Sequence, residues 1–166
     1  MYLIKINVLN NISKLYKKFI IFNNYLIMDN LLKQKDEIRD SFNKIATVLF
    51  SHLANKYPET EFGTYRITIH KYITELPYEP IAQFIKHVYS NDNYREKILI
   101  GDESFFLNQT YDNHSSEQNQ IFMMKDIWLK MDQQNKQFVK NAFKSLVERS
   151  KLYIDVLCDI NKIKKH

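Results

Sequence analysis

The sequence predicts an all-α protein, a single globular bundle of about five to seven helices. Three observations carry this prediction: apolar residues recur at helical spacing along most of the chain, only two glycines and three prolines occur, and 45 % of the residues are hydrophobic. Turn-rich all-β chains need more glycine and proline, and disordered chains contain fewer hydrophobic residues. A chain of 166 residues can bury one core without a metal ion or a disulfide bond.

The first 28 residues differ in composition from the rest of the chain. Residues 1–28 are apolar and basic and contain no acidic residue, whereas acidic residues recur from Asp29 onward. We therefore predict a basic apolar leader over 1–28, a helical domain over 29–160 and a short basic tail over 161–166.

The leader fits neither a signal peptide nor a membrane span. Its apolar runs are shorter than the core of a signal peptide, and Asn23 and Asn24 interrupt the best of them. Three interpretations stay open: a flexible arm, upstream sequence translated in frame before a start at Met28, and a helix that lies on a membrane surface through its lysines.

The first helix of the domain is expected to begin after Asp29, a residue type that favours the N-cap. It should end before Pro58, because proline cannot donate to the helical hydrogen-bond ladder. Its apolar stripe consists of Leu31, Leu32, Ile38, Phe42, Ile45, Leu49, Leu53 and Tyr57.

Shorter segments follow. Thr64 can cap a second helix, although the alternation over 65–69 leaves a short strand open. Pro80 suits the first turn of a third helix. A fourth helical segment over 94–100 is expected to end at Gly101.

The remaining elements complete the predicted bundle. Asp102 and Glu103 precede an apolar cluster, as acids often do at a helix N-terminus. Residues 108–119 are polar without an apolar period and indicate an exposed loop. Residues 121–131 are apolar nearly all round, so a helix there is central or covered by a partner.

A last amphipathic helix is expected after Asp132, which can cap it. Residues 152–160 then extend this helix or follow it after a bend. Five apolar residues in this half of the chain are candidate core or interaction anchors: Phe105, Phe106, Met124, Trp128 and Met131. For Trp128 the core is favoured over a partner-binding hot spot, because a domain of this size needs large aromatic side chains inside.

The net charge of +5 comes from the ends of the chain. Residues 29–161 hold fewer basic than acidic residues, so the footprint of a phosphate-binding domain is absent there. The candidate nucleic-acid contacts are therefore the terminal lysines, namely Lys14, Lys17, Lys18, Lys162, Lys164 and Lys165.

Little in the sequence points to catalysis. Two glycines cannot build a phosphate-binding loop, and the histidines form no zinc motif and suit partly buried positions with one hydrogen bond. Cys158 stands in an apolar context and is expected to be an inert core cysteine. One acid/base or metal set can be assembled, and it consists of Asp102, Glu103, Asp112 and His114. Because adjacent acids at a helix start are usually capping residues, we expect no enzyme, no cofactor and no metal site.

The order of these signals resembles a group of small uncharacterised helical proteins of nucleocytoplasmic large DNA viruses, the mimivirus relatives. The resemblance spans roughly residues 31–152. It is carried by Pro80-Ile81, Asp102-Glu103-Ser104-Phe105-Phe106-Leu107 followed by Tyr111, Ile127-Trp128-Leu129, and Asn135-Lys136. The chain departs from the pattern at Asp132, where serine is expected, and at Phe138-Val139, where Ile-Trp is expected. These are packing and capping residues, so the resemblance implies no activity, cofactor or catalytic residue.

The leading functional hypothesis is an intracellular viral structural or protein–protein interaction module, located in the infected-cell cytoplasm or the virion, with a viral or host protein as partner. Nucleic-acid association through the terminal lysines and a metal-dependent enzyme are the alternatives. No secretion, membrane span or small-molecule ligand is expected.

Overall fold

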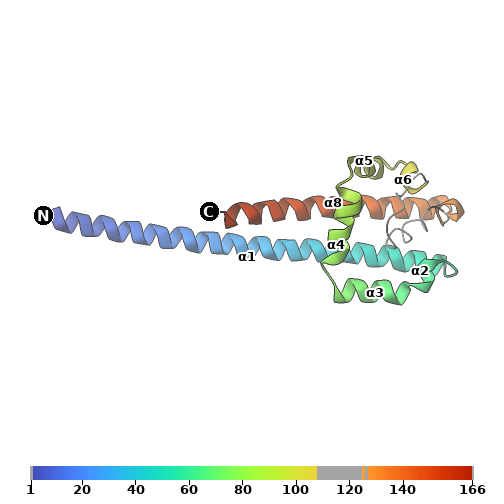
Figure 1. The fold of residues 1–166 in the computed structure, drawn as a ribbon, viewed down its shortest axis with the longest axis horizontal. Helices are drawn as coiled ribbons and strands as arrows, with labels where there is room; N and C mark the ends of the chain where they lie inside the picture. The colour runs from blue at the N-terminus through green and yellow to red at the C-terminus, as the bar shows by residue number, and fades with distance from the viewer. Residues whose placement is uncertain (1, 108–124, 126, 166) are drawn as a thin grey trace. The chain divides into compact units, whose positions relative to one another are not determined.

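The computed structural model describes the backbone of residues 2–107, 125 and 127–165, and all of their side chains except those of residues 2–13, 16 and 17. Within these ranges the chain forms helices and turns and no strand, which confirms the predicted all-α class. The elements are α1 (Tyr2–Lys56), α2 (Glu61–Thr64), α3 (Arg66–Glu75), α4 (Glu79–Phe84), the π-helical turn η1 (Ile85–Tyr89), α5 (Asp92–Ile100), α6 (Ser104–Leu107) and α8 (Gln133–Lys164) (Figure 1).

The chain divides into two units. Unit 1 comprises Met1–Glu37 and Ile154–His166, and unit 2 comprises Ile38–Tyr153. Helices α1 and α8 each contribute residues to both units, whereas α2 to α6 belong to unit 2 alone. Unit 2 is thus the helical bundle and holds most of the described buried side chains.

The first helix begins far ahead of its predicted start. α1 runs from Tyr2 to Lys56 without interruption, so Asp29 lies inside the helix and the prediction that it caps a helix is wrong. The leader lacks glycine and proline, and nothing in its composition ends a helix before Asp29. The predicted end is confirmed, because α1 stops two residues before Pro58.

In unit 2, the C-terminal part of α1 and the N-terminal part of α8 run antiparallel. His52 contacts Asn135, with Nε2 and Oδ1 2.7 Å apart, and Arg149 Nε donates to Ser41 Oγ at 3.0 Å. The later residue of α8 thus pairs with the earlier residue of α1, as in two antiparallel helices. Figure 1 shows α3 beside α1, while α5 and α6 lie beside α8.

Helix α4 bridges the two long helices. The ring centroid of Phe84 in α4 is 5.5 Å from that of Phe42 in α1 and 6.2 Å from that of Phe143 in α8. Pro80 sits in the first turn of α4, as predicted. The turn η1 continues α4, and Ser90 N donates to Ile85 O, five residues back.

The second helix differs from the prediction. Thr64 is the last residue of α2 and caps nothing, and residues 65–69 are helical or in a turn rather than a strand. A tight turn after Pro58 explains the separate short helix. A Cβ atom on Gly63 would clash with the backbone of Pro58, so only glycine allows this close approach.

Several predicted boundaries of the later elements are confirmed, although α5 begins at Asp92 rather than at residue 94. Gly101 ends α5 with φ 74°, a left-handed conformation that favours glycine. α8 continues to Lys164, so residues 152–160 extend the last helix without a new start. The predicted loop over 108–119 lies outside the described residues. Of the predicted helix over 121–131, residues 125 and 127–130 are helical and Met131 is not.

The core of unit 2 combines residues from nearly every element. Its buried side chains include Phe42, Leu49, Leu53, Phe62, Ile73, Ile81, Val88, Ile98, Phe105, Phe106, Ile127, Trp128, Met131, Val139, Leu146 and Val147. None of the helices in the described ranges is long and apolar enough to cross a membrane.

Candidate functional site

Trp128 lies at the centre of an aromatic cluster. Its side chain is 0 % exposed, and its ring stacks on Phe106 with the centroids 4.0 Å apart and the planes 10° apart. Phe105 and Phe143 pack edge-on against Phe106, at 4.9 and 5.2 Å between centroids. Trp128 is therefore a core residue here, as expected, and does not offer a surface to a partner.

The other predicted anchors that the structure describes are buried as well. Met131 is buried, and Phe105 and Phe106 are both buried. Met124 lies outside the described residues. Leu129, the neighbour of Trp128, is 64 % exposed, so the described part of the helix 127–130 is not covered all round.

Glu103 ties this cluster to α8. Its Oε2 accepts a hydrogen bond from Trp128 Nε1 at 3.2 Å, and its Oε1 accepts one from Lys140 Nζ at 2.9 Å. Lys136 Nζ lies 3.9 Å from Oε2. The hydrogen bond from Lys140, followed by that from Trp128, holds the pKa of Glu103 below its usual range. Glu103 is thus an ionised packing residue rather than a proton donor.

The predicted metal or acid/base set is not assembled by the described residues. Both carboxylate oxygens of Asp102 accept bonds from Ser104, at 2.8 Å from its backbone N and at 2.9 Å from its Oγ. The backbone bond, followed by the hydroxyl bond, lowers the pKa of Asp102, whose carboxylate is thus bound to the first residue of α6. Asp112 and His114 lie outside the described residues. Among the residues that the structure describes, no three potential ligands gather around a metal position.

A polar junction joins the end of α1 to the start of α8. Asp132 caps α8 as predicted: its Oδ1 accepts from Asn135 N and its Oδ2 from Asn135 Nδ2, both at 2.8 Å. Because that amide donates to Asp132, its oxygen accepts the 2.7 Å bond from His52 Nε2. The backbone bond of Asn135 lowers the pKa of Asp132. The half-buried His52 has the one bond expected of a structural histidine.

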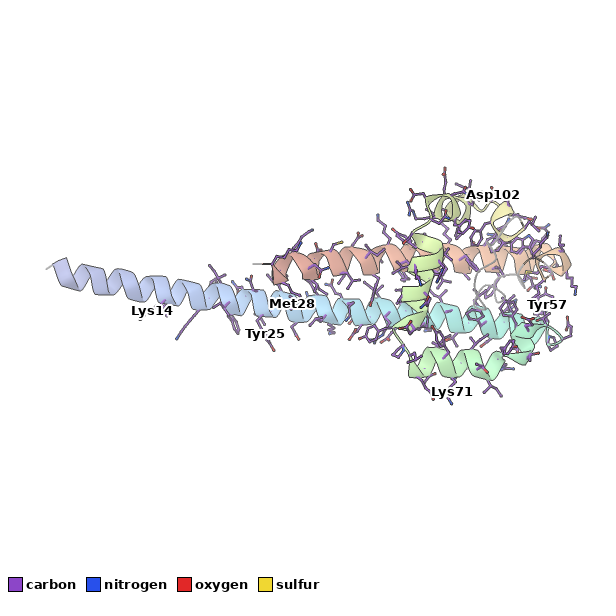
Figure 2. All side chains as sticks on the ribbon, viewed as in Figure 1. Lys14, Tyr25, Met28, Tyr57, Lys71 and Asp102 are labelled. Carbon is purple, nitrogen blue, oxygen red and sulfur yellow. The ribbon has the colours of Figure 1, made fainter. Side chains whose placement is uncertain are left out.

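An open groove of about 440 Å³ lies between α1 and α3 in unit 2. Its apolar part is formed by Phe50 of α1 with Ile67, Ile69 and Ile73 of α3. Ile67 is 81 % exposed, and the polar and charged lining residues are Thr47, Ser51, Arg66, His70, Lys71, Thr74 and Glu75. Figure 2 shows Lys71 on the outer side of α3.

Sequence reasoning missed this groove. The signal that could have found it is the apolar content of residues 65–76, which exceeds what one buried stripe uses. Only Ile73 of α3 is buried, so the remaining apolar side chains of that helix meet solvent.

The terminal lysines lie at the surface wherever their side chains are described. Lys14, Lys18, Lys162, Lys164 and Lys165 are exposed; the side chain of Lys17 lies outside the described set. Lys162 donates to Asp159 at 2.8 Å, and this bond raises the pKa of Lys162.

Cys158 is exposed rather than buried, so the prediction of a core cysteine is wrong. Of the apolar residues over 154–160, only Ile160 is buried. A run of mixed apolar residues does not by itself say which of them faces inward.

Comparison of the chain with protein-family models, with curated proteins and with solved structures found no match in any of the three.

Proposed function

We propose that the chain is a protein–protein interaction module that acts by binding, and that the groove between α1 and α3 is its docking surface. One observation carries this proposal. Ile67, which is 81 % exposed, and the half-buried Phe50 and Ile69 line an open groove at the surface of unit 2 together with the buried Ile73. An exposed apolar patch rimmed by polar residues is typical of an interaction site.

The shape of the groove favours a helical segment of a partner. Most of its lining side chains on α3 are exposed, whereas small-molecule sites enclose their ligand. A groove along two roughly parallel helices accepts the apolar face of a third helix, with contacts repeating every three or four residues.

The charge of the rim favours acidic residues beside that apolar face. Arg66 and Lys71 outnumber Glu75, and Lys71 Nζ is 3.8 Å from Glu75 Oε1 in an exposed pair. Such exposed pairs contribute little and separate readily. Lys71 is therefore free to pair with a carboxylate on the edge of a bound helix, whereas Arg66 already donates to Asn55 Oδ1 at 2.9 Å.

The proposal extends to the setting of the module. Its partner would be a viral or host protein within the infected cell or the virion, in keeping with the resemblance to helical proteins of large DNA viruses. It assigns no catalytic residue, because the carboxylates Asp102, Glu103 and Asp132 are each engaged in capping or packing bonds.

A library of helical peptides displayed on phage tests the docking surface directly. The expected peptides carry apolar residues three and four apart, with Asp or Glu beside them. Ile67→Asp should weaken selected peptides at least tenfold, because the new charge meets their apolar face. Lys71→Glu should weaken them less, and lysine in place of a peptide acid should restore the affinity.

Ile100→Asp is the matched control. Ile100 is 71 % exposed and lies on α5 of the same unit, outside the groove. It should leave peptide binding unchanged. Selected peptides that bind Ile67→Asp and the unchanged protein equally would overturn the proposal, as would a library that yields no binder.

A further inference from the structure

A second apolar surface lies on α1 within unit 1. Leu15, Phe19, Phe22 and Leu26 are each 50 to 67 % exposed. They are spaced by four, three and four residues, and at about 100° per residue they fall within one narrow arc of the helix. The helix thus presents a continuous apolar stripe to solvent.

Lysines and a tyrosine border this stripe. The helical spacing places Lys14, Lys18 and Tyr25 along one edge of it, and all three side chains are exposed. No acidic residue occurs anywhere in residues 1–28. The stripe therefore combines an apolar face with positive charge that nothing nearby in the sequence neutralises.

The C-terminal part of α8 leaves the stripe uncovered. In unit 1 this part of α8 buries its Ile160, while Met28 and Leu31 of α1 are half-buried. Figure 2 shows Lys14 on a portion of α1 beyond the end of α8. The end of α8 adds Lys162, Lys164 and Lys165, so unit 1 holds nine lysines and five acids.

This distribution of charge distinguishes between two candidate occupants of the stripe, a second copy of the chain and an anionic membrane surface. A second copy of the chain, paired along the same stripe, would set lysines beside lysines, and paired helices in water need opposite charges at those edges. A surface of anionic phospholipids supplies the missing negative charge and an apolar layer together. Helices with an apolar face, aromatic residues and flanking lysines are typical of such surfaces.

We propose that α1 binds the surface of an anionic membrane through Leu15, Phe19, Phe22 and Leu26, with Lys14 and Lys18 contacting lipid phosphates. The apolar side chains enter the boundary between headgroups and acyl chains, and the lysines remain at headgroup level. The helix lies on the bilayer and does not cross it, since no described helix is apolar and long enough to span. This inference is independent of the groove on α3, which belongs to unit 2.

Co-sedimentation of the full chain with vesicles tests it. Vesicles of phosphatidylcholine and phosphatidylserine in a roughly two-to-one ratio should bind the protein at about 0.15 M salt, and vesicles of phosphatidylcholine alone should bind it far less. Phe19→Ser with Phe22→Ser should lower the partition coefficient at least tenfold. Lys14→Gln with Lys18→Gln should lower it on the order of tenfold.

Matched controls use exposed residues of unit 2. Ile67→Ser with Ile100→Ser, and Lys44→Gln with Lys86→Gln, should leave vesicle binding unchanged. Because all the altered residues are exposed, every variant should melt at the temperature of the unchanged protein, which separates lost binding from lost folding.

Three results would overturn the proposal. The first is equal binding to neutral and anionic vesicles. The second is no vesicle binding together with a dimer that Phe19→Ser and Phe22→Ser dissociate, which would assign the stripe to a second copy. The third is no vesicle binding together with duplex DNA binding that Lys14→Gln and Lys18→Gln abolish, which would assign the lysines to nucleic acid.

Discussion

Phe106 lies flat against Trp128, with the ring centroids 4.0 Å apart and the planes inclined by only 10°. The two residues come from segments on either side of a long polar stretch of sequence, and their contact joins α6 to the residues that precede α8. Trp128 is also held at its polar edge, because its Nε1 donates to Glu103 at 3.2 Å. This pair is therefore both a packing contact and a link between elements.

Trp128→Ala should lower the free energy of unfolding by roughly 3–5 kcal/mol, because it removes the largest fully buried side chain and leaves a cavity. Denaturant unfolding followed by circular dichroism measures the change. The neighbouring Leu129→Ala is the control: this side chain is 64 % exposed, and the change should be within about 0.5 kcal/mol. Equal effects of the two substitutions would contradict the buried position of Trp128.

Glu103→Gln should alter the pH dependence of stability. The pKa of Glu103 is lowered in the folded state, mainly by the bond from Lys140, so its stabilising contribution is complete above the unfolded value of about 4.3 and is lost as the pH falls through the folded value. The difference in unfolding free energy between Glu103→Gln and the unchanged protein should be constant from about pH 7 to 5 and shrink below about pH 4.

The pKa values of Asp102 and Asp132 are lowered too, so protonation of these two carboxylates also destabilises the unchanged protein in acid. The difference between Glu103→Gln and the unchanged protein removes this shared effect. Glu148→Gln, at an exposed position on α8, is the control and should give only a small difference. A Glu103→Gln difference that grows in acid would be incompatible with the bonds from Lys140 and Trp128.

Local signals predicted the ends of several helices correctly. Pro58, Pro80, Gly101 and Asp132 each act within one turn of their own position, through a missing N–H, a fixed φ, a left-handed conformation or a capping carboxylate. Asp29 carries the same kind of signal without effect. A capping residue starts a helix only where the preceding residues leave the helix, and the residues before Asp29 contain no helix breaker.

The sequence patterns did not predict the long-range contacts. The density of apolar residues around Trp128 predicted a core anchor, but the bond from Lys140 to Glu103 joins positions 37 residues apart and depends on how α6 meets α8. The groove likewise depends on the direction in which α3 returns along α1 after the turn at Pro58, which Gly63 approaches closely. Periodicity identifies an apolar face, and only the packing shows which part of it stays exposed.

Asp132→Ala should destabilise the protein by about 1 kcal/mol, and up to about 2 kcal/mol because Asn135 loses both of its bonds to the carboxylate. Asp132→Asn should retain most of the stability, since asparagine is an equally good N-cap. Denaturant unfolding of the three proteins at neutral pH measures both changes. A loss as large for Asn as for Ala would show that the charge at the N-terminus of α8 matters more than the capping bond.

Cys158 should react with a thiol reagent in the folded protein. Its side chain is exposed on α8, so modification by an aromatic disulfide should proceed without unfolding and yield one labelled thiol per chain. Absorbance during the reaction, with and without denaturant, gives the two rates. Protection of more than about a hundredfold in the absence of denaturant would indicate a buried thiol and would restore the original interpretation of the sequence.

Deletion of residues 1–27 should leave unit 2 nearly as stable as in the full chain, with a loss below about 1 kcal/mol and a fall in Tm of less than about 2 to 4 °C. The buried apolar side chains in the described part of the chain begin at Phe42, and the described apolar residues of α1 that are half-buried in unit 1, Met28 and Leu31, are retained by this deletion. Deletion of residues 1–37 is the contrasting variant. It removes Met28 and Leu31, exposes Ile160 and should cost more. Thermal melts followed by circular dichroism separate the two deletions, and a drop of many degrees for the shorter one would mean that the leader packs into the core.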